Sequence, residues 1–229
     1  MNFYTKIAIL AVLYSSFSCT KGGGNIYVEG RVYNPVTGEG IPNVTLNLYR
    51  PEMGGTIGNS SGNKTVETAQ TDDEGYYEIS HLGGAYTYRL KIVPEPDRFL
   101  NLGTAPNDFD VEIGNDAFIV DKGTNMTVDF FATYYGKLRY EINNVNCQGS
   151  TDNFKLFFMG TEVGYQNDHI GVVTIEGDGC FESNDNTFAE VPMGDRYYKI
   201  EITKNGQTTS YLDTITIQEG QEYVYEINY

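Results

Sequence analysis

The sequence predicts an all-β protein that is built as two tandem β-sandwiches of about seven strands each. Apolar and polar residues alternate in short runs, and clusters of Gly, Asn and Asp interrupt these runs at close intervals. Tyrosine is abundant, with 19 residues, and aromatic side chains favour strands. After residue 20 no stretch keeps the apolar period of a helix. The length allows one large sandwich or two small ones, and the repeated strand pattern favours two.

The first half covers residues 26–133 and begins with five strands. A turn follows the first strand, where Pro35 fixes one φ angle and Gly38 leaves another open. Residues 71–77 are expected to form a tight hairpin that leads into the fourth strand. The strands are expected at residues 26–33, 44–48, 66–71, from Tyr76 onward, and at 85–93.

Four pieces of this half carry a family resemblance. They are V-x-G-x-V centred on Gly30, P-x-T-G-x-x-I-P-x-V-x-L at 35–46, T-D-x-x-G-x-Y at 71–77, and Y-x-L-x-I at 88–92. Together they resemble the carboxypeptidase regulatory-like domain, which is a transthyretin-like sandwich. With this fold, Gly30 is expected where neighbouring strands cross and Gly75 in a turn with positive φ. Tyr77 is expected to point inward at the end of the fourth strand.

Residues 94–116 depart from that pattern as a long, irregular, acidic insert that contains Pro94, Pro96 and Pro106. Loops of this length without secondary structure are uncommon in compact domains and are often functional. We interpret the insert as a variable edge that faces a partner, with a passive insertion as the alternative. Residues 118–120 and 126–131 are expected to return as strands and to complete the sandwich.

The second half covers residues 134–229 and carries no recognisable family motif. Seven short strands in this length suggest another immunoglobulin-like or transthyretin-like sandwich. The last segment, 222–229, alternates strongly and is expected to close the second sheet. The strands are expected at residues 138–143, 154–158, 172–175, 188–191, 197–203, 209–217 and 223–229.

The beginning of the chain has the pattern of a secretory signal peptide over residues 1–18, with an apolar run too short to remain as a membrane helix. Residues 19–25 follow as a glycine-rich tether. Cys19, at this junction, resembles the lipid-attachment cysteine of bacterial lipoproteins. The resemblance implies acyl chains on Cys19 and a membrane anchor in a Gram-negative cell envelope, with the outer membrane as the expected place. Periplasmic and surface-facing placements both stay open, and ordinary secretion is the alternative.

Two further cysteines, Cys147 and Cys180, form an even pair in an exported chain. We predict a disulfide between them, which would stabilise the fold by roughly 3–4 kcal/mol on the chain-entropy model. Two buried free thiols are the alternative.

Composition and motifs argue against nucleic-acid binding and against catalysis. The net charge is −16, and binding to nucleic acid requires a basic face. The two histidines, His81 and His169, lie outside any zinc-peptidase motif, and there is no G-x-S-x-G elbow. His81 is expected to follow a strand, in a capping or surface role. We therefore predict a protein that is not an enzyme and needs no cofactor.

Calcium is the alternative cofactor, because two acidic clusters carry oxygen ligands. The first cluster lies in a turn of the fold motif, where Asp before Gly has a conformational reason. Neither cluster has the ligand spacing of a twelve-residue calcium loop. The weak metal candidates are Asp178, Glu182 and Asp185 (with Asn184), and the turn cluster is Asp72, Asp73 and Glu74.

The function that these features favour is adhesion, scaffolding or accessory binding at the outer membrane, with a protein or polysaccharide as partner. The recognition loops are expected at 51–64, 94–116 and 178–187. A glycan-binding lipoprotein of a polysaccharide-uptake system is the alternative. The observation in favour of this alternative is the presence of adjacent tyrosines, since two neighbouring residues of a strand place one ring outward, where it can stack on a sugar. Trp, the usual residue for such stacking, is absent. These pairs are Tyr76–Tyr77, Tyr134–Tyr135 and Tyr197–Tyr198.

Overall fold

The computed structural model describes residues 24–51, 62–105, 117–163, 171–184 and 186–229. The predictions on the signal peptide, Cys19, His169 and Asp185 lie outside these ranges, as do most of the loop 51–64 and residues 106–116 of the insert. Within them the chain forms strands and turns that build four sheets, which confirms the all-β prediction. The described residues include no helix that is long and apolar enough to cross a membrane.

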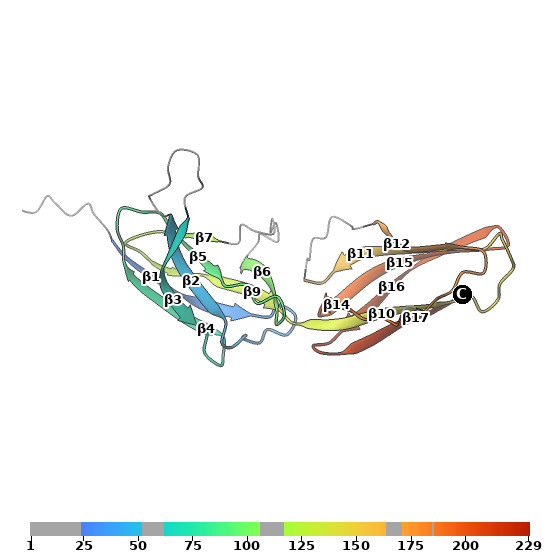
Figure 1. Cartoon of the computed structure of the whole chain (residues 1–229), viewed down its shortest axis with the longest axis horizontal. Helices are drawn as coiled ribbons and strands as arrows, with labels where there is room; N and C mark the ends of the chain where they lie inside the picture. The colour runs from blue at the N-terminus through green and yellow to red at the C-terminus, as the bar shows by residue number, and fades with distance from the viewer. Residues whose placement is uncertain (1–23, 52–61, 106–116, 164–170, 185) are drawn as a thin grey trace, which may run out of the picture.

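The first nine strands form two sheets that pack against each other (Figure 1). One sheet has the order β4-β1-β9-β6, with β8 also pairing with β1, and the other has the order β3-β2-β5-β7. The strands are β1 (Asn25–Tyr33), β2 (Thr45–Pro51), β3 (Asn63–Gln70), β4 (Tyr76–Leu82), β5 (Tyr88–Ile92), β6 (Leu100–Ala105), β7 (Phe118–Val120), β8 (Asn125–Thr127) and β9 (Asp129–Thr133).

The alternating residues of these strands explain the packing. In β1, Ile26, Val28 and Val32 are fully buried and Gly30 is buried with them, whereas the alternate positions 27, 29 and 31 are more exposed. Leu46 and Leu48 of β2 complete the opposite layer of the same apolar cluster. Because successive side chains of a strand point to opposite faces, the period of two in the sequence separates a core face from a solvent face.

The remaining strands form a second pair of sheets with an apolar cluster of their own. One sheet has the order β13-β10-β14, with β17 pairing parallel to β10, and the other has the order β12-β11-β15-β16. Strand β17 therefore closes a sheet, as the sequence predicts. The strands are β10 (Tyr135–Asn143), β11 (Asn153–Thr161), β12 (Val173–Asp178), β13 (Ser183–Asn184), β14 (Ala189–Pro192), β15 (Gly194–Lys204), β16 (Gln207–Ile217) and β17 (Glu222–Asn228).

Three local predictions need correction. The turn at 71–77 is not a hairpin, because β3 and β4 belong to different sheets and the chain crosses between them there. The insert 94–116 is not irregular throughout, since β6 lies within it and pairs antiparallel with β9. The tether predicted to reach residue 25 ends earlier, because β1 already begins at Asn25.

Candidate functional site

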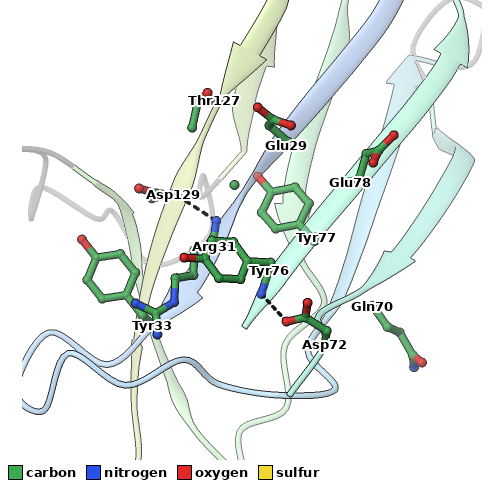
Figure 2. Close-up of a pocket in the computed structure, with 11 residues that line it drawn as sticks. Glu29, Arg31, Tyr33, Gln70, Asp72, Tyr76, Tyr77, Glu78, Thr127 and Asp129 are labelled. Carbon is green, nitrogen blue, oxygen red and sulfur yellow. Dashed lines mark hydrogen bonds between the residues drawn. The ribbon is translucent and has the colours of Figure 1, made fainter. Parts of the chain in front are cut away.

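An open groove of about 930 Å³ lies over β1, between β4 on one side and β8 and β9 on the other (Figure 2). We call it the β1 groove. Its walls come mainly from the residues of these strands that alternate with the buried ones. The lining residues are Glu29, Gly30, Arg31, Tyr33, Gln70, Asp72, Tyr76, Tyr77, Glu78, Thr127 and Asp129.

The groove opens where the chain beside β1 is interrupted at Val128, between β8 and β9. The Val128 N–H donates to the Glu29 carbonyl at 2.8 Å, and the Val128 carbonyl accepts from the Tyr77 hydroxyl at 2.6 Å. Gly30 permits this close approach, because a Cβ at that position would collide with the Val128 carbonyl oxygen. One residue further, the Arg31 N–H donates to the side chain of Asp129 at 2.8 Å instead of to a backbone carbonyl.

Arg31 is held at one end of the groove by aromatic and backbone contacts. Its guanidinium carbon lies 5.6 Å from the ring centroid of Tyr33 and 5.4 Å from that of Tyr76. Its Nε donates to the Glu74 carbonyl at 2.8 Å, and its Nη1 donates to the Gly38 carbonyl at 3.2 Å. The cation–π contacts thus fix the position of the Tyr76 ring, which is 56% exposed.

The groove is acidic, because Arg31 offsets only one of its four carboxylates. Asp72 shapes the wall, since its Oδ1 accepts the backbone N–H groups of Glu74 at 3.1 Å and Tyr76 at 2.7 Å. Burial raises the pKa of Tyr77 well above its ordinary range, and the nearby Asp129 carboxylate adds to the rise. Tyr77 therefore remains neutral and keeps its hydrogen bond at any physiological pH. The carboxylates are those of Glu29, Asp72, Glu78 and Asp129.

The chemistry of this arrangement suits binding. The Tyr76 ring offers a flat apolar face to solvent, and the carboxylates beside it accept hydrogen bonds. The described lining residues include no histidine, cysteine or serine.

The structure places the predicted site residues elsewhere. Cys147 and Cys180 form a disulfide with a Cα–Cα distance of 5.3 Å. The Asp178 Oδ1 accepts a hydrogen bond from the Asn153 Nδ2 at 2.7 Å, and Glu182 is exposed. Across the described ranges, no three or more His, Cys, Asp or Glu side chains are grouped so as to hold a metal ion.

His81 lies within β4 and not after a strand, so the predicted position needs correction. Its Nδ1 is 3.0 Å from the Glu67 Oε1, and its ring centroid is 5.4 Å from that of Tyr88. These contacts join β4 to β3 and β5 of the opposite sheet, which is a structural role.

Two of the three tyrosine pairs have one ring outward, as expected for strands. Tyr76 is 56% exposed and Tyr77 is 5% exposed, while Tyr197 is 38% exposed and Tyr198 is buried. In the third pair, Tyr134 and Tyr135 are both half-buried.

Sequence reasoning named Gly30, Asp72, Tyr76 and Tyr77 without assigning them to one groove, and it gave no role to the other lining residues. Glu29, Arg31 and Tyr33 occupy every second position of β1, and they alternate with the positions that include the buried Val28 and Val32. That alternation would have predicted that the three side chains share the outer face of the strand. It could not have predicted the other wall of the groove, because β8 and β9 pair with β1 from a distant part of the sequence.

No protein-family model matches the sequence, and no curated protein matches it. Among solved structures, the Bacillus anthracis TIE protein is similar at 17% identity with a TM-score of 0.36; the match covers 90% of this chain and 34% of that protein. The shaft pilin SpaA from Lactobacillus rhamnosus GG has 9% identity, a TM-score of 0.31 and coverages of 90% and 97%. A DUF3823 family protein from Bacteroides ovatus has 12% identity, a TM-score of 0.29 and coverages of 84% and 100%.

Proposed function

We propose that the chain is a non-enzymatic binding module of the Gram-negative cell envelope, anchored through acyl chains on Cys19, and that the β1 groove binds a polysaccharide segment. In this role it acts in adhesion, scaffolding or accessory binding at the outer membrane. The observation that carries the proposal is the exposed Tyr76 ring, which stands beside carboxylates in an open groove.

The groove matches the two-sided chemistry of a sugar. A pyranose presents an apolar face of C–H groups, which packs on an aromatic ring, and a rim of hydroxyls, which donate to carboxylates. Tyr76 supplies the ring, and Glu78, two residues along β4 and therefore on the same face, supplies an acceptor. Glu29 pairs with Glu78 across the ladder, so two acceptors stand side by side.

Pre-organisation supports the proposal. Arg31 fixes the Tyr76 ring through its guanidinium, and Tyr77 and Gly30 fix the backbone below. A ring that is already immobilised loses little conformational entropy when a ligand binds.

The resemblance of Cys19 to a lipid-attachment cysteine supports the proposed location. Each buried methylene contributes about 0.8 kcal/mol, so several acyl chains hold the protein at the membrane. Labelling of growing cells with an alkyne palmitate analogue tests this point. We expect the wild-type chain to be labelled and Cys19→Ser to be unlabelled; a wild-type chain that stays unlabelled at full precursor length contradicts the anchor.

Affinity gel electrophoresis with plant and host polysaccharides tests the groove. We expect retardation of the wild-type protein on at least one polysaccharide and its loss in Tyr76→Ala and Glu78→Gln. Tyr211→Ala is the matched control, because Tyr211 is 44% exposed on β16, outside the groove. Retention by Tyr76→Ala would contradict the groove as the site. The absence of retention on every polysaccharide would favour a scaffold that faces a protein.

An assay for released reducing ends on any retained polysaccharide tests the non-enzymatic assignment. We expect no release. Release that disappears in His81→Ala or His169→Ala would contradict the assignment.

A further inference from the structure

An amine, a carboxamide and a carboxylate meet in the second pair of sheets, at the end where β10 and β15 finish. Lys204 is the last residue of β15, Asn144 follows β10, and Asp152 precedes β11. The Lys204 Nζ contacts the Asn144 Oδ1 and lies 3.1 Å from the Asp152 Oδ2. The Asn144 Nδ2 lies 3.4 Å from the same Asp152 oxygen.

The two acceptor side chains are buried and fixed. Asn144 is 8% exposed and Asp152 is 1% exposed. Asp152 accepts the backbone N–H of Gln148 at 2.9 Å and that of Asn205 at 3.3 Å. The Asn144 Nδ2 also donates to the Gly179 carbonyl at 3.3 Å. These bonds hold the carboxamide in one orientation toward the amine. Because the folded chain already places the two groups together, the reaction itself loses little conformational entropy.

Two aromatic rings lie beside the amine of Lys204. The Lys204 Nζ lies 4.5 Å from the ring centroid of Tyr229, whose ring packs at 5.0 Å on that of Phe154. Phe154 is fully buried and Tyr229 is 7% exposed. The two rings therefore pack one side of the site at which the amine meets the carboxamide.

We propose that Lys204 and Asn144 join in an intramolecular isopeptide bond, with Asp152 as the proton carrier. A carboxylate within hydrogen-bond reach of both nitrogens is the group that such a reaction requires, because one proton must leave the amine and another must reach the leaving nitrogen. The cross-link is independent of the proposed binding function.

The reaction balances without any other reactant. A proton passes from the Lys204 ammonium to the Asp152 Oδ2. The neutral amine attacks the Asn144 Cγ, forming a C–N bond, and the carbonyl electrons move to Oδ1. Asp152 returns the proton to Nδ2, the old C–N bond breaks, and Oδ1 regains its double bond. The new amide nitrogen loses its extra proton through Asp152 to the departing ammonia. Lysine ammonium and asparagine carboxamide thus become a secondary amide and an ammonium ion, and Asp152 is unchanged.

The first proton transfer is energetically unfavourable. Hydrogen bonds, led by that from the Gln148 N–H, lower the pKa of Asp152 to about 2, so the carboxylate resists protonation. Bond formation is therefore a slow maturation that follows folding.

The bond would connect the two sheets of the second half, since β10 and β15 belong to different sheets. The Cys147–Cys180 disulfide lies in the neighbouring loops, between β10 and β11 and after β12. The isopeptide bond would add a connection at this end that reducing agents do not break.

Peptide mapping by mass spectrometry of the reduced, full-length protein tests the proposal. We expect a branched peptide that joins the segments of Lys204 and Asn144 and is lighter than their sum by one ammonia. Lys204→Arg keeps the positive charge and should lose the branched peptide, as should Asp152→Asn. Lys155→Arg is the control, because the Lys155 Nζ lies 2.9 Å from the Glu176 Oε1 in an ordinary ion pair on the same sheet.

The wild-type map decides the outcome even where a variant fails to fold. Unlinked peptides of Lys204 and Asn144 after prolonged incubation of the folded protein would overturn the proposal. Loss of ammonia without a branched peptide would also overturn it, because it would show that Asn144 had cyclised on its own backbone.

Discussion

The hydroxyl of Tyr77 donates a 2.6 Å hydrogen bond to the carbonyl of Val128, across the central strand β1. Gly30 of β1 pairs directly with Tyr77 and has no side chain to block this reach. A glycine and a tyrosine that are far apart in the sequence thus hold the interrupted β8–β9 segment in place, and the β1 groove depends on that interruption.

Removal of the Tyr77 hydroxyl should destabilise the protein. Tyr77→Phe keeps the ring but leaves the buried Val128 carbonyl without its partner, which costs about 1–3 kcal/mol. Urea unfolding followed by circular dichroism measures the change in the free energy of unfolding. Tyr76→Phe is the control and should change it by less than about 0.5 kcal/mol, because Tyr76 is largely exposed. Equal effects of the two variants would contradict this account.

A methyl group at Gly30 should be poorly tolerated. The added carbon of Gly30→Ala meets the backbone oxygen of Val128, which no side-chain rotation can relieve. Overpacking of this kind typically costs about 1–3 kcal/mol. The midpoint of urea unfolding should fall, whereas Glu29→Ala, at an exposed neighbouring position, should leave it nearly unchanged. A Gly30→Ala protein of wild-type stability would show that the backbone has room to move apart.

The sequence predicts the strands better than their partners. Val28, Val32, Leu46 and Leu48 alternate strictly, and the structure buries all of them. The residues at 71–77 define a turn with Gly75 at a φ of 85°, as expected. They carry no information on whether the next strand pairs with the previous one or enters the opposite sheet. The hairpin prediction was wrong for that reason.

Strand β6 was missed because its pairing is non-local. Leu100 and Leu102 provide only a short alternation, and the prolines of the insert favour loop structure. The partner strand β9 begins at Asp129 and pairs in parallel with β1. That pairing also has no signal in the local sequence. The carboxylate of Asp129 could not therefore be placed in the groove from the sequence.

The half-buried Tyr140 and the buried Tyr225 should resist ionisation in alkaline solution. Burial raises the pKa of Tyr140 and Tyr225 well above the ordinary value, and hydrogen bonds to Tyr198 and Asp213 respectively add to the rise. Since the neutral forms are favoured in the folded state, their contribution to stability is complete below about pH 10, the ordinary tyrosine pKa. It is lost as the pH rises further.

Absorbance of tyrosinate, recorded together with circular dichroism, checks this prediction. We expect exposed tyrosines to titrate first and a second group to ionise only as the fold is lost. Tyr225→Phe should shift unfolding to higher pH. A single titration of all tyrosines in the intact fold would contradict the burial described above.

Acid should weaken the end of the second half that contains Asp152. The pKa of Asp152 is lowered to about 2 from an ordinary value of 3.8, chiefly by the Gln148 N–H. Its contribution to stability is therefore present above about pH 4 and disappears as the pH falls toward 2. Asp152→Asn should flatten the dependence of the unfolding free energy on pH in this window. Glu219→Gln, at an exposed position, is the control and should leave this pH dependence unchanged. The same pH dependence in the wild type and in Asp152→Asn would refute the contribution of Asp152 to stability.

The Cys147–Cys180 disulfide should protect both thiols in the native protein and stabilise the second half. Alkylation without reductant should leave both residues unmodified, as read by peptide mass. Reduction should lower the free energy of unfolding by roughly 3–4 kcal/mol on the chain-entropy model, because the unfolded chain regains its loop freedom. The double variant Cys147→Ser and Cys180→Ser should match the reduced protein and should not respond to reductant. Alkylation of both cysteines in the untreated native protein would show that they remain free thiols.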